Sequence, residues 1–167
     1  LHAVCMGDMH LLDAVKRNVN RETKIALGIS GNSLEEIDFA INYLNHPNIV
    51  LMYGFQNYPT KFSQINFNKL KKIMQFYPNC EFGYADHCGF DEEFNELVTI
   101  IGASLGVDYI EKHVTTTLGV PRIDYEATIS LDMLNNLSDK LQIVSQSLGT
   151  GTLEFSEGEK NYSKLGT

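Results

Sequence analysis

Basic residues, long apolar runs and paired cysteines are all scarce in this sequence, and each shortage excludes a class of protein. The 13 lysines and arginines are outnumbered by 21 aspartates and glutamates, and the net charge of −8 leaves no basic surface to neutralise nucleic-acid phosphates. No apolar run approaches the roughly 20 residues of a membrane-spanning helix. The first residues show no charged segment followed by an apolar one, so we expect no secretory signal peptide.

The cysteines are few and irregularly placed. Cys5, Cys80 and Cys88 form an odd set without CxxC spacing. This pattern favours reduced thiols and a cytoplasmic location. With 43% apolar and 20% charged residues, the chain of 167 residues is typical of a soluble globular domain with a sizeable core.

Two kinds of apolar pattern alternate along the chain. Short apolar runs typical of strands are expected at residues 3–6, 24–28, 49–53, 81–87 and 107–113. Each is followed by apolar residues at helical spacing, and one of these helices is expected to begin with a capping box of Ser33 and Glu36. Five strands alternating with five helices predict a parallel α/β sheet. We expect residues 1–150 to form this domain and residues 151–167 a polar tail or linker.

Two architectures are compatible with this pattern, an open doubly wound sheet and part of a (β/α)₈ barrel. Neither GxGxxG nor GxxxxGK followed by Ser or Thr occurs, so a nucleotide-binding sheet has no support in the sequence. Polar residues follow every expected strand, as the top face of a barrel requires. Five units cannot close an eight-stranded barrel of about 250 residues. The prediction is therefore an α/β fold of the parallel TIM-barrel type with about five of its eight βα units.

Two histidines end neighbouring expected strands. His87 and His113 flank a strand–helix–strand unit, whose two strands are normally parallel. Both imidazoles should therefore emerge at the carboxyl edge of the sheet, where α/β folds place their ligands. Two imidazoles there suit a divalent metal ion. The alternative is that each is an ordinary surface or core histidine, since their separation of 26 residues matches no short metal motif.

Several blocks of the sequence together resemble the sialic acid synthase family. They are Gly54–Thr60 (GFQNYPT), Ala85–His87 (ADH), Glu111–Thr115 (EKHVT) and Asp124. The resemblance covers most of the chain and implies the C-terminal part of a catalytic (β/α)₈ barrel. It also implies the condensation of phosphoenolpyruvate with an N-acetylated amino sugar, such as N-acetylmannosamine, to a nine-carbon 2-keto acid and phosphate.

The resemblance implies roles for individual residues. His87 and His113 would hold a divalent metal, for which Mn²⁺ is expected. Tyr58 would lie in the phosphoenolpyruvate pocket, and Asp124 would contact the acceptor sugar. We expect catalytic roles for Lys112 and Asp124. The expected substrate-binding residues are Gln56, Tyr58, Asp86, Thr115 and Arg122.

Some of these assignments have alternatives. Lys112 is the nearest cation for the phosphate or carboxylate of the substrate, although it could equally pair with Glu111 or Asp86. Ala85 stands where the family commonly has a serine, and Gln56 where it commonly has an asparagine. Two other functions remain open: a non-catalytic partial-barrel binding module, and a different metal-dependent barrel lyase or aldolase. The expected partners are the two substrates, with a homo-oligomer or a longer chain completing the fold, and neither nucleic acid nor membrane.

Overall fold

The computed structural model describes residues 1–54 and 57–166 of the chain. Five strands form one sheet and lie in it in the order in which they occur in the sequence. They are β1 (Ile25–Gly28), β2 (Ile49–Tyr53), β3 (Glu81–Asp86), β4 (Tyr109–Thr115) and β5 (Thr128–Ser130). Every neighbouring pair is parallel.

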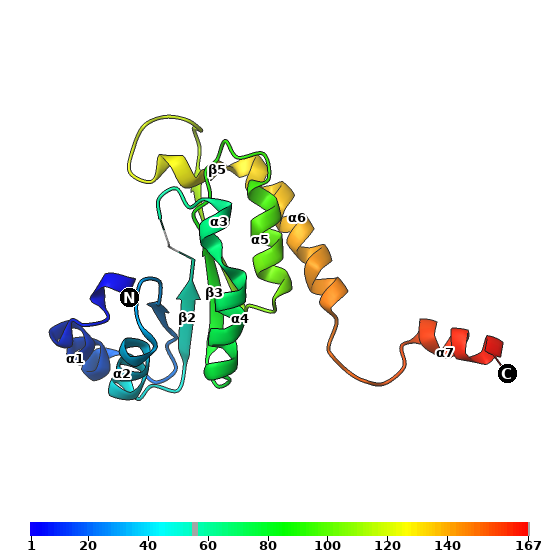
Figure 1. Ribbon diagram of the computed structural model, residues 1–167, viewed down its shortest axis with the longest axis horizontal. Helices are drawn as coiled ribbons and strands as arrows, with labels where there is room; N and C mark the ends of the chain where they lie inside the picture. The colour runs from blue at the N-terminus through cyan, green and yellow to red at the C-terminus, as the bar shows by residue number, and fades with distance from the viewer. Residues whose placement is uncertain (55–56, 167) are drawn as a thin grey trace.

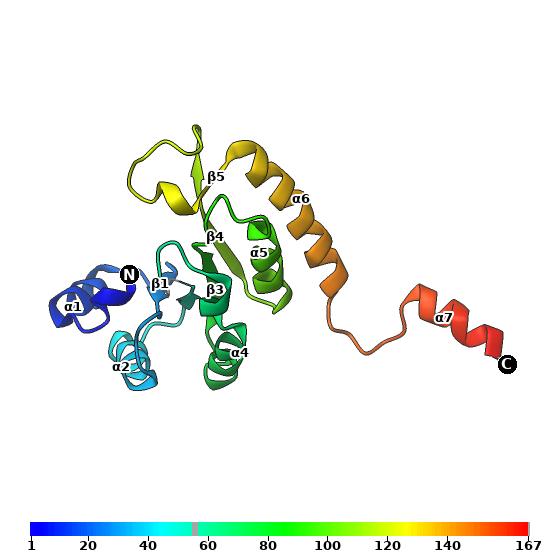
Figure 2. The ribbon, with the colours of Figure 1, turned by 45° about the horizontal axis from the view of Figure 1, so that its top comes forward.

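This strand order distinguishes the two expected architectures. A doubly wound sheet reverses its strand order at a switch point, whereas the strands of a barrel follow one another around an arc. The five strands follow such an arc without reversal, and the helices cover its outer side (Figure 2). The fold is therefore a half-barrel of the TIM-barrel type, and the expected α/β class is confirmed.

Seven α-helices and three short 3₁₀-helices occur among the described residues. The α-helices are α1 (Met9–Asn18), α2 (Leu34–Leu44), α3 (Phe62–Ile65), α4 (Phe67–Phe76), α5 (Asn95–Ser104), α6 (Leu131–Leu148) and α7 (Glu157–Ser163). The 3₁₀-helices are η1 (Ala3–Cys5), η2 (Tyr125–Ala127) and η3 (Lys164–Gly166). The expected capping box opens α2, where Ser33 and Glu36 exchange hydrogen bonds of 2.7 and 3.3 Å. None of the described helices is long and apolar enough to cross a membrane.

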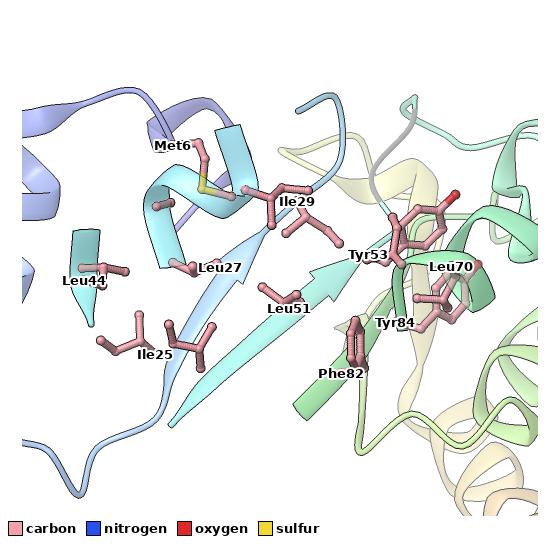
Figure 3. Packing of buried hydrophobic residues seen from close by; sticks show 14 of the residues in the cluster. Met6, Ile25, Leu27, Ile29, Leu44, Leu51, Tyr53, Leu70, Phe82 and Tyr84 are labelled. Carbon is pink, nitrogen blue, oxygen red and sulfur yellow. The ribbon is translucent and has the colours of Figure 1, made fainter. Parts of the chain in front are cut away.

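The core lies between the outer face of the sheet and the helices (Figure 3). Alternate residues of the strands point into it, because successive side chains of a strand face opposite sides. Leu27 of β1, Leu51 of β2 and Tyr84 of β3 are almost completely buried there. Gly102 lets α5 approach the sheet, since a Cβ atom at this position would overlap the ring of Tyr84. The other face of the same strands remains available for a site.

One local expectation is wrong, and one strand was not expected. Residues 3–6 were expected to form a strand, but Ala3–Cys5 form η1, which His2 caps through its side chain at the amide of Val4. Asp8 caps α1 directly afterwards, and the two caps leave no room for a strand. The second difference is β5, which the sequence did not reveal because its three residues are too few to show a period.

The end of the chain also contains a helix that its polar composition did not indicate. Ser156 and Glu159 form a capping box that opens α7. Figures 1 and 2 both show α7 set apart from the half-barrel, beyond an extended segment that follows α6.

Candidate metal centre at the carboxyl edge of the sheet

The register between β3 and β4 decides which side chains meet at the site. Ala85 lies opposite Glu111, and Asp86 lies opposite Lys112. Ala85 and Glu111 line a cavity on the inner face of the half-barrel, whereas Asp86 pairs with Lys112 on the side of α5. The alternation of a strand then returns the next residues along the chain to the inner face.

His87 and His113 meet on this inner face. Their ring centroids lie 5.1 Å apart, with an angle of 61° between the ring planes. Nδ1 of His87 lies 3.1 Å from the carbonyl oxygen of Ala85. Because a carbonyl only accepts, Nδ1 carries the proton, and Nε2 is the unprotonated nitrogen of the ring. Burial of His87, helped by the neighbouring His113, lowers the pKa of this imidazole below its ordinary value and favours the neutral, metal-binding form.

Glu111 completes the cluster. One potential ligand atom from each of Glu111, His87 and His113 can be chosen so that all three lie within 4.8 Å of one another. Sequence reasoning treated Glu111 only as a possible partner of Lys112. The signal that could have identified it is its position two residues before His113, which puts both side chains on the same face of β4.

Tyr58 covers the two imidazoles. Its ring centroid lies 5.9 Å from that of His87 and 6.4 Å from that of His113. The loop that carries Tyr58 is fixed to the site, since the amide of Thr60 donates to the carbonyl oxygen of His87 at 2.8 Å. Burial raises the pKa of Tyr58, so that its phenol remains protonated near neutral pH.

A cavity of about 640 Å³ connects these groups with Asp124. Asp124 adopts a left-handed backbone conformation, with φ of 63°, directly before η2. The loop before β5 is tied to the loop after β3, because the amide of Phe90 donates to the carbonyl oxygen of Glu126 at 2.9 Å. Tyr58, Asp124 and the two histidines are therefore brought to one cavity.

Other expected site residues lie elsewhere. Lys112 and Asp86 were expected to contact the substrates, but both side chains are withdrawn from the cavity, with 3% and 0% of their surface exposed. They lie on the opposite face of the strands because they alternate with Glu111 and with Ala85. Arg122 is exposed and donates to the carbonyl oxygen of Thr117 at 2.9 Å.

Thr115 and Gln56 are the two remaining residues that were expected to bind substrate. Thr115 is buried at the end of β4, where its hydroxyl lies 3.1 Å from the amide of Thr117. Gln56 lies outside the described residues. The neighbouring Gly54 is described, with φ of 143°, and a Cβ atom there would overlap the carbonyl oxygen of Ala85. Only glycine therefore allows β2 to pass this close to β3 at the edge of the site.

The cluster has the chemistry of a divalent metal site. Two imidazole nitrogens and one carboxylate oxygen are ligands for Mn²⁺, Fe²⁺ or Zn²⁺, and three protein ligands leave positions for substrate and water. The tautomer of His87 and its lowered pKa agree with this use. The donors present thus fit a divalent metal ion.

Comparisons with known proteins agree with this description. The chain is 25% identical over 111 residues to the N,N'-diacetyllegionaminic acid synthase of Legionella pneumophila, covering 66% of this chain and 30% of that protein. It is 22% identical over 151 residues to an uncharacterized protein of Methanocaldococcus jannaschii, covering 89% and 43%. The chain thus spans less than half the length of these relatives.

The fold is also found in solved structures. The N-acetylneuraminic acid (sialic acid) synthetase of Leptospira borgpetersenii superposes with a TM-score of 0.84 at 21% identity, over 99% of this chain and 55% of that one. A 3-deoxy-heptulosonate phosphate (DAHP) synthase of Thermotoga maritima superposes with a TM-score of 0.72 at 13% identity, over 89% and 44%. The NeuB family profile matches residues 2–153, nearly the whole chain. The chain therefore belongs to the NeuB family, as a sialic acid synthase-like portion of its TIM barrel.

Proposed function

We propose that this chain carries the metal-binding half of an active site that condenses phosphoenolpyruvate with an N-acetylated amino sugar. The products would be a nine-carbon 2-keto acid and phosphate. The observation that carries the proposal is the cluster of His87, Glu111 and His113, which shares one cavity with Tyr58 and Asp124. Membership of the NeuB family supports the same reaction class.

The three clustered residues would hold the divalent metal, with Mn²⁺ as the proposed ion. When bound, such an ion supplies Lewis-acid polarisation of a carbonyl oxygen, here that of the open-chain sugar aldehyde. His87 would bind the ion through Nε2, because Nδ1 lies at the carbonyl oxygen of Ala85. Glu111 adds a negative charge that neutral imidazoles lack, which strengthens the binding of a divalent cation.

Tyr58 and Asp124 would orient the substrates. The protonated phenol of Tyr58 can donate a hydrogen bond to phosphoenolpyruvate, and its ring shields one side of the imidazoles from water. The carboxylate of Asp124 can accept hydrogen bonds from the hydroxyl groups of the sugar. Holding both reactants in one cavity lowers the entropic part of the barrier to carbon–carbon bond formation.

The phosphate group needs positive charge that these residues do not supply. Among the described residues that line the cavity there is no lysine or arginine, because Lys112 is engaged behind the sheet. We propose that the missing cations come from βα units that complete the barrel. This agrees with the share of its relatives that the chain spans.

The test is phosphate release by the complete native protein supplied with Mn²⁺, phosphoenolpyruvate and N-acetylmannosamine. His87→Ala and His113→Ala should each reduce the rate by at least about 100-fold, since each removes a metal ligand. His10→Ala on the exposed surface of α1 is the matched control and should retain the wild-type rate. Other N-acetylated amino sugars and phosphorylated aldoses, tested in parallel, identify the acceptor. Turnover with phosphorylated aldoses alone would favour the same condensation with another acceptor, and no phosphate release with any acceptor would favour a lyase, an aldolase or a binding module.

A further inference from the structure

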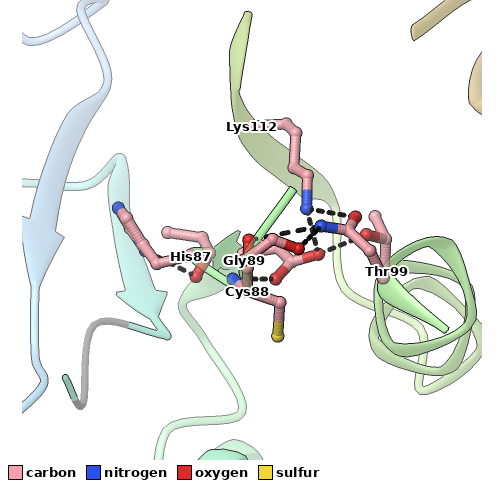
Figure 4. Close-up of polar contacts among 8 residues, drawn as sticks. His87, Cys88, Gly89, Thr99 and Lys112 are labelled. Carbon is pink, nitrogen blue, oxygen red and sulfur yellow. Dashed lines mark hydrogen bonds and ion pairs between the residues drawn. The ribbon is translucent and has the colours of Figure 1, made fainter. Parts of the chain in front are cut away.

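A buried polar network lies directly behind the metal-binding cluster (Figure 4). The ammonium group of Lys112 donates to Oδ2 of Asp86 and to Oδ1 of Asn95, both at 2.7 Å. The hydroxyl of Thr99 also donates to Oδ2 of Asp86. The backbone amide of Cys88 donates to Oδ1 of the same carboxylate at 2.9 Å. The network thus joins β3, β4 and α5 through a single ion pair.

The ion pair lies where it can control both metal-binding histidines. Asp86 precedes His87 on β3, and Lys112 precedes His113 on β4. The register pairs Asp86 with Lys112 across the two strands. Because side chains alternate, a slip of one residue between these strands would turn one imidazole away from the cavity. An ion pair at this position favours one register over its neighbours.

The network also fixes the backbone on the far side of His87. Asp86 accepts from the amide of Cys88, so its carboxylate spans His87 in a local Asx-type turn. Asn95 continues this support, since its amide nitrogen donates to the carbonyl oxygens of Cys88 and Gly89 at 3.2 and 2.7 Å. Figure 4 shows the His87 ring pointing away from this network, while Lys112 reaches into it. Asp86 and Asn95 thereby fix the backbone next to His87 from the side opposite the cavity.

Stability alone gives little reason to bury such a pair. Desolvation of two charges offsets most of their attraction, and well-packed apolar residues of similar volume often serve equally well. An apolar pair could not make the hydrogen bonds by which Asp86 and Lys112 join the two strands to α5 and to the amide of Cys88. The structure therefore suggests that the pair serves the geometry of the site.

We propose that the Asp86–Lys112 ion pair is a positioning device that sets the separation and orientation of His87 and His113 and thereby the affinity for the metal. The inference rests on the proposed metal centre. Neither residue touches the cavity, so both act through the histidines that follow them. Loss of the pair should weaken metal binding even in protein that remains folded.

The experiment measures Mn²⁺ binding by electron paramagnetic resonance and calorimetry on the complete native protein. Asp86→Asn/Lys112→Met removes both charges at nearly constant volume and should raise the Kd for Mn²⁺ by about 10-fold or more, as expected for residues that orient metal ligands. Leu12→Ala is the matched control, because Leu12 is completely buried but lies in α1. It should lower the melting temperature and leave the Kd unchanged.

The outcomes separate this inference from the proposed function. Wild-type protein that binds Mn²⁺ no better than His87→Ala/His113→Ala overturns the metal centre and the positioning role with it. Wild-type binding with an unchanged Kd in the double variant overturns the positioning role alone. If the double variant does not fold, Asp86→Asn alone decides, because it removes the negative charge of the pair at nearly the same volume and leaves Lys112 its contact with Asn95. A severalfold rise in Kd supports the proposal, and an unchanged Kd contradicts it.

Discussion

The substitution Lys112→Met tests the energetics of the buried pair through its dependence on pH. Lys112 and Asp86 expose 3% and 0% of their side-chain surface. Removing the cation leaves the carboxylate of Asp86 buried without its charge partner, and breaking such a pair costs about 3–5 kcal/mol. We expect Lys112→Met to lose stability of this order at pH 7.

Asp86 should make the free energy of unfolding depend on pH with opposite signs in the wild type and in Lys112→Met. In the wild type, burial acts to raise the pKa of Asp86, but Lys112 and the donors Thr99 and Cys88 outweigh it and hold the pKa below 3.8. This contribution to stability is present above pH 3.8 and is lost as the pH falls through the folded pKa. In Lys112→Met burial dominates, and the folded pKa lies above 3.8. As the pH falls from this folded pKa to pH 3.8, the free energy of unfolding of the variant should therefore rise by about 1.4 kcal/mol per pH unit.

Urea unfolding from pH 4 to pH 8, followed by circular dichroism, measures this difference. Lys140→Met is the matched control, because Lys140 pairs with Glu96 on the surface, where an ion pair is worth about 1 kcal/mol or less. It should shift the midpoint slightly and almost equally at every pH. If the loss of stability in Lys112→Met does not diminish toward pH 4, the loss does not come from the unpaired carboxylate of Asp86, and the reasoning is refuted.

Three further predictions concern the edge of the sheet and its cavity. Asp124→Ala should raise the KM for the amino sugar much more than that for phosphoenolpyruvate in steady-state kinetics, and the reverse would show that the roles are exchanged. Gly54→Ala should cost about 3 kcal/mol or more in thermal melting, because its Cβ atom overlaps Ala85 and φ is 143°. Gly31→Ala, with φ of 80° in open space, should cost only about 1 kcal/mol. The 167-residue chain alone should give no sustained phosphate release, and turnover by a monodisperse monomer would contradict this.

The sequence was most informative where one period extended over a whole element. Strands β2, β3 and β4 and the capping box of α2 follow directly from such patterns. The approach of His87 to His113 also follows, because parallel strands bring equivalent ends to one edge. Short elements were not predictable: η1 depends on two adjacent caps, and β5 has three residues. Their conformation is decided by tertiary contacts that no local pattern encodes.

The positions of Lys112 and Glu111 show a different limit. The sequence favoured Lys112 as a substrate contact because it is the nearest cation for a phosphate or carboxylate. In the structure Lys112 lies on the outer face, because a residue adjacent to an inward histidine faces outward, and its catalytic role stays a prediction. The same alternation identifies Glu111 as an inward neighbour of His113. Whether a residue has an odd or even position on its strand therefore indicates the face on which it lies, which its charge alone does not.

This parity connects the chemistry of the site with the stability of the sheet. On β3 and β4, inward positions carry the proposed ligands, and the outward positions between them carry a buried ion pair. A metal site needs several ligands held within a few tenths of an ångström, and β3 and β4, of six and seven residues, bring His87 and His113 to the same face in one register only. Placing opposite charges on the reverse face penalises every register but one, without occupying the cavity. On this argument the ion pair would hold the proposed ligands on β3 and β4 in one register and leave the cavity to the substrates.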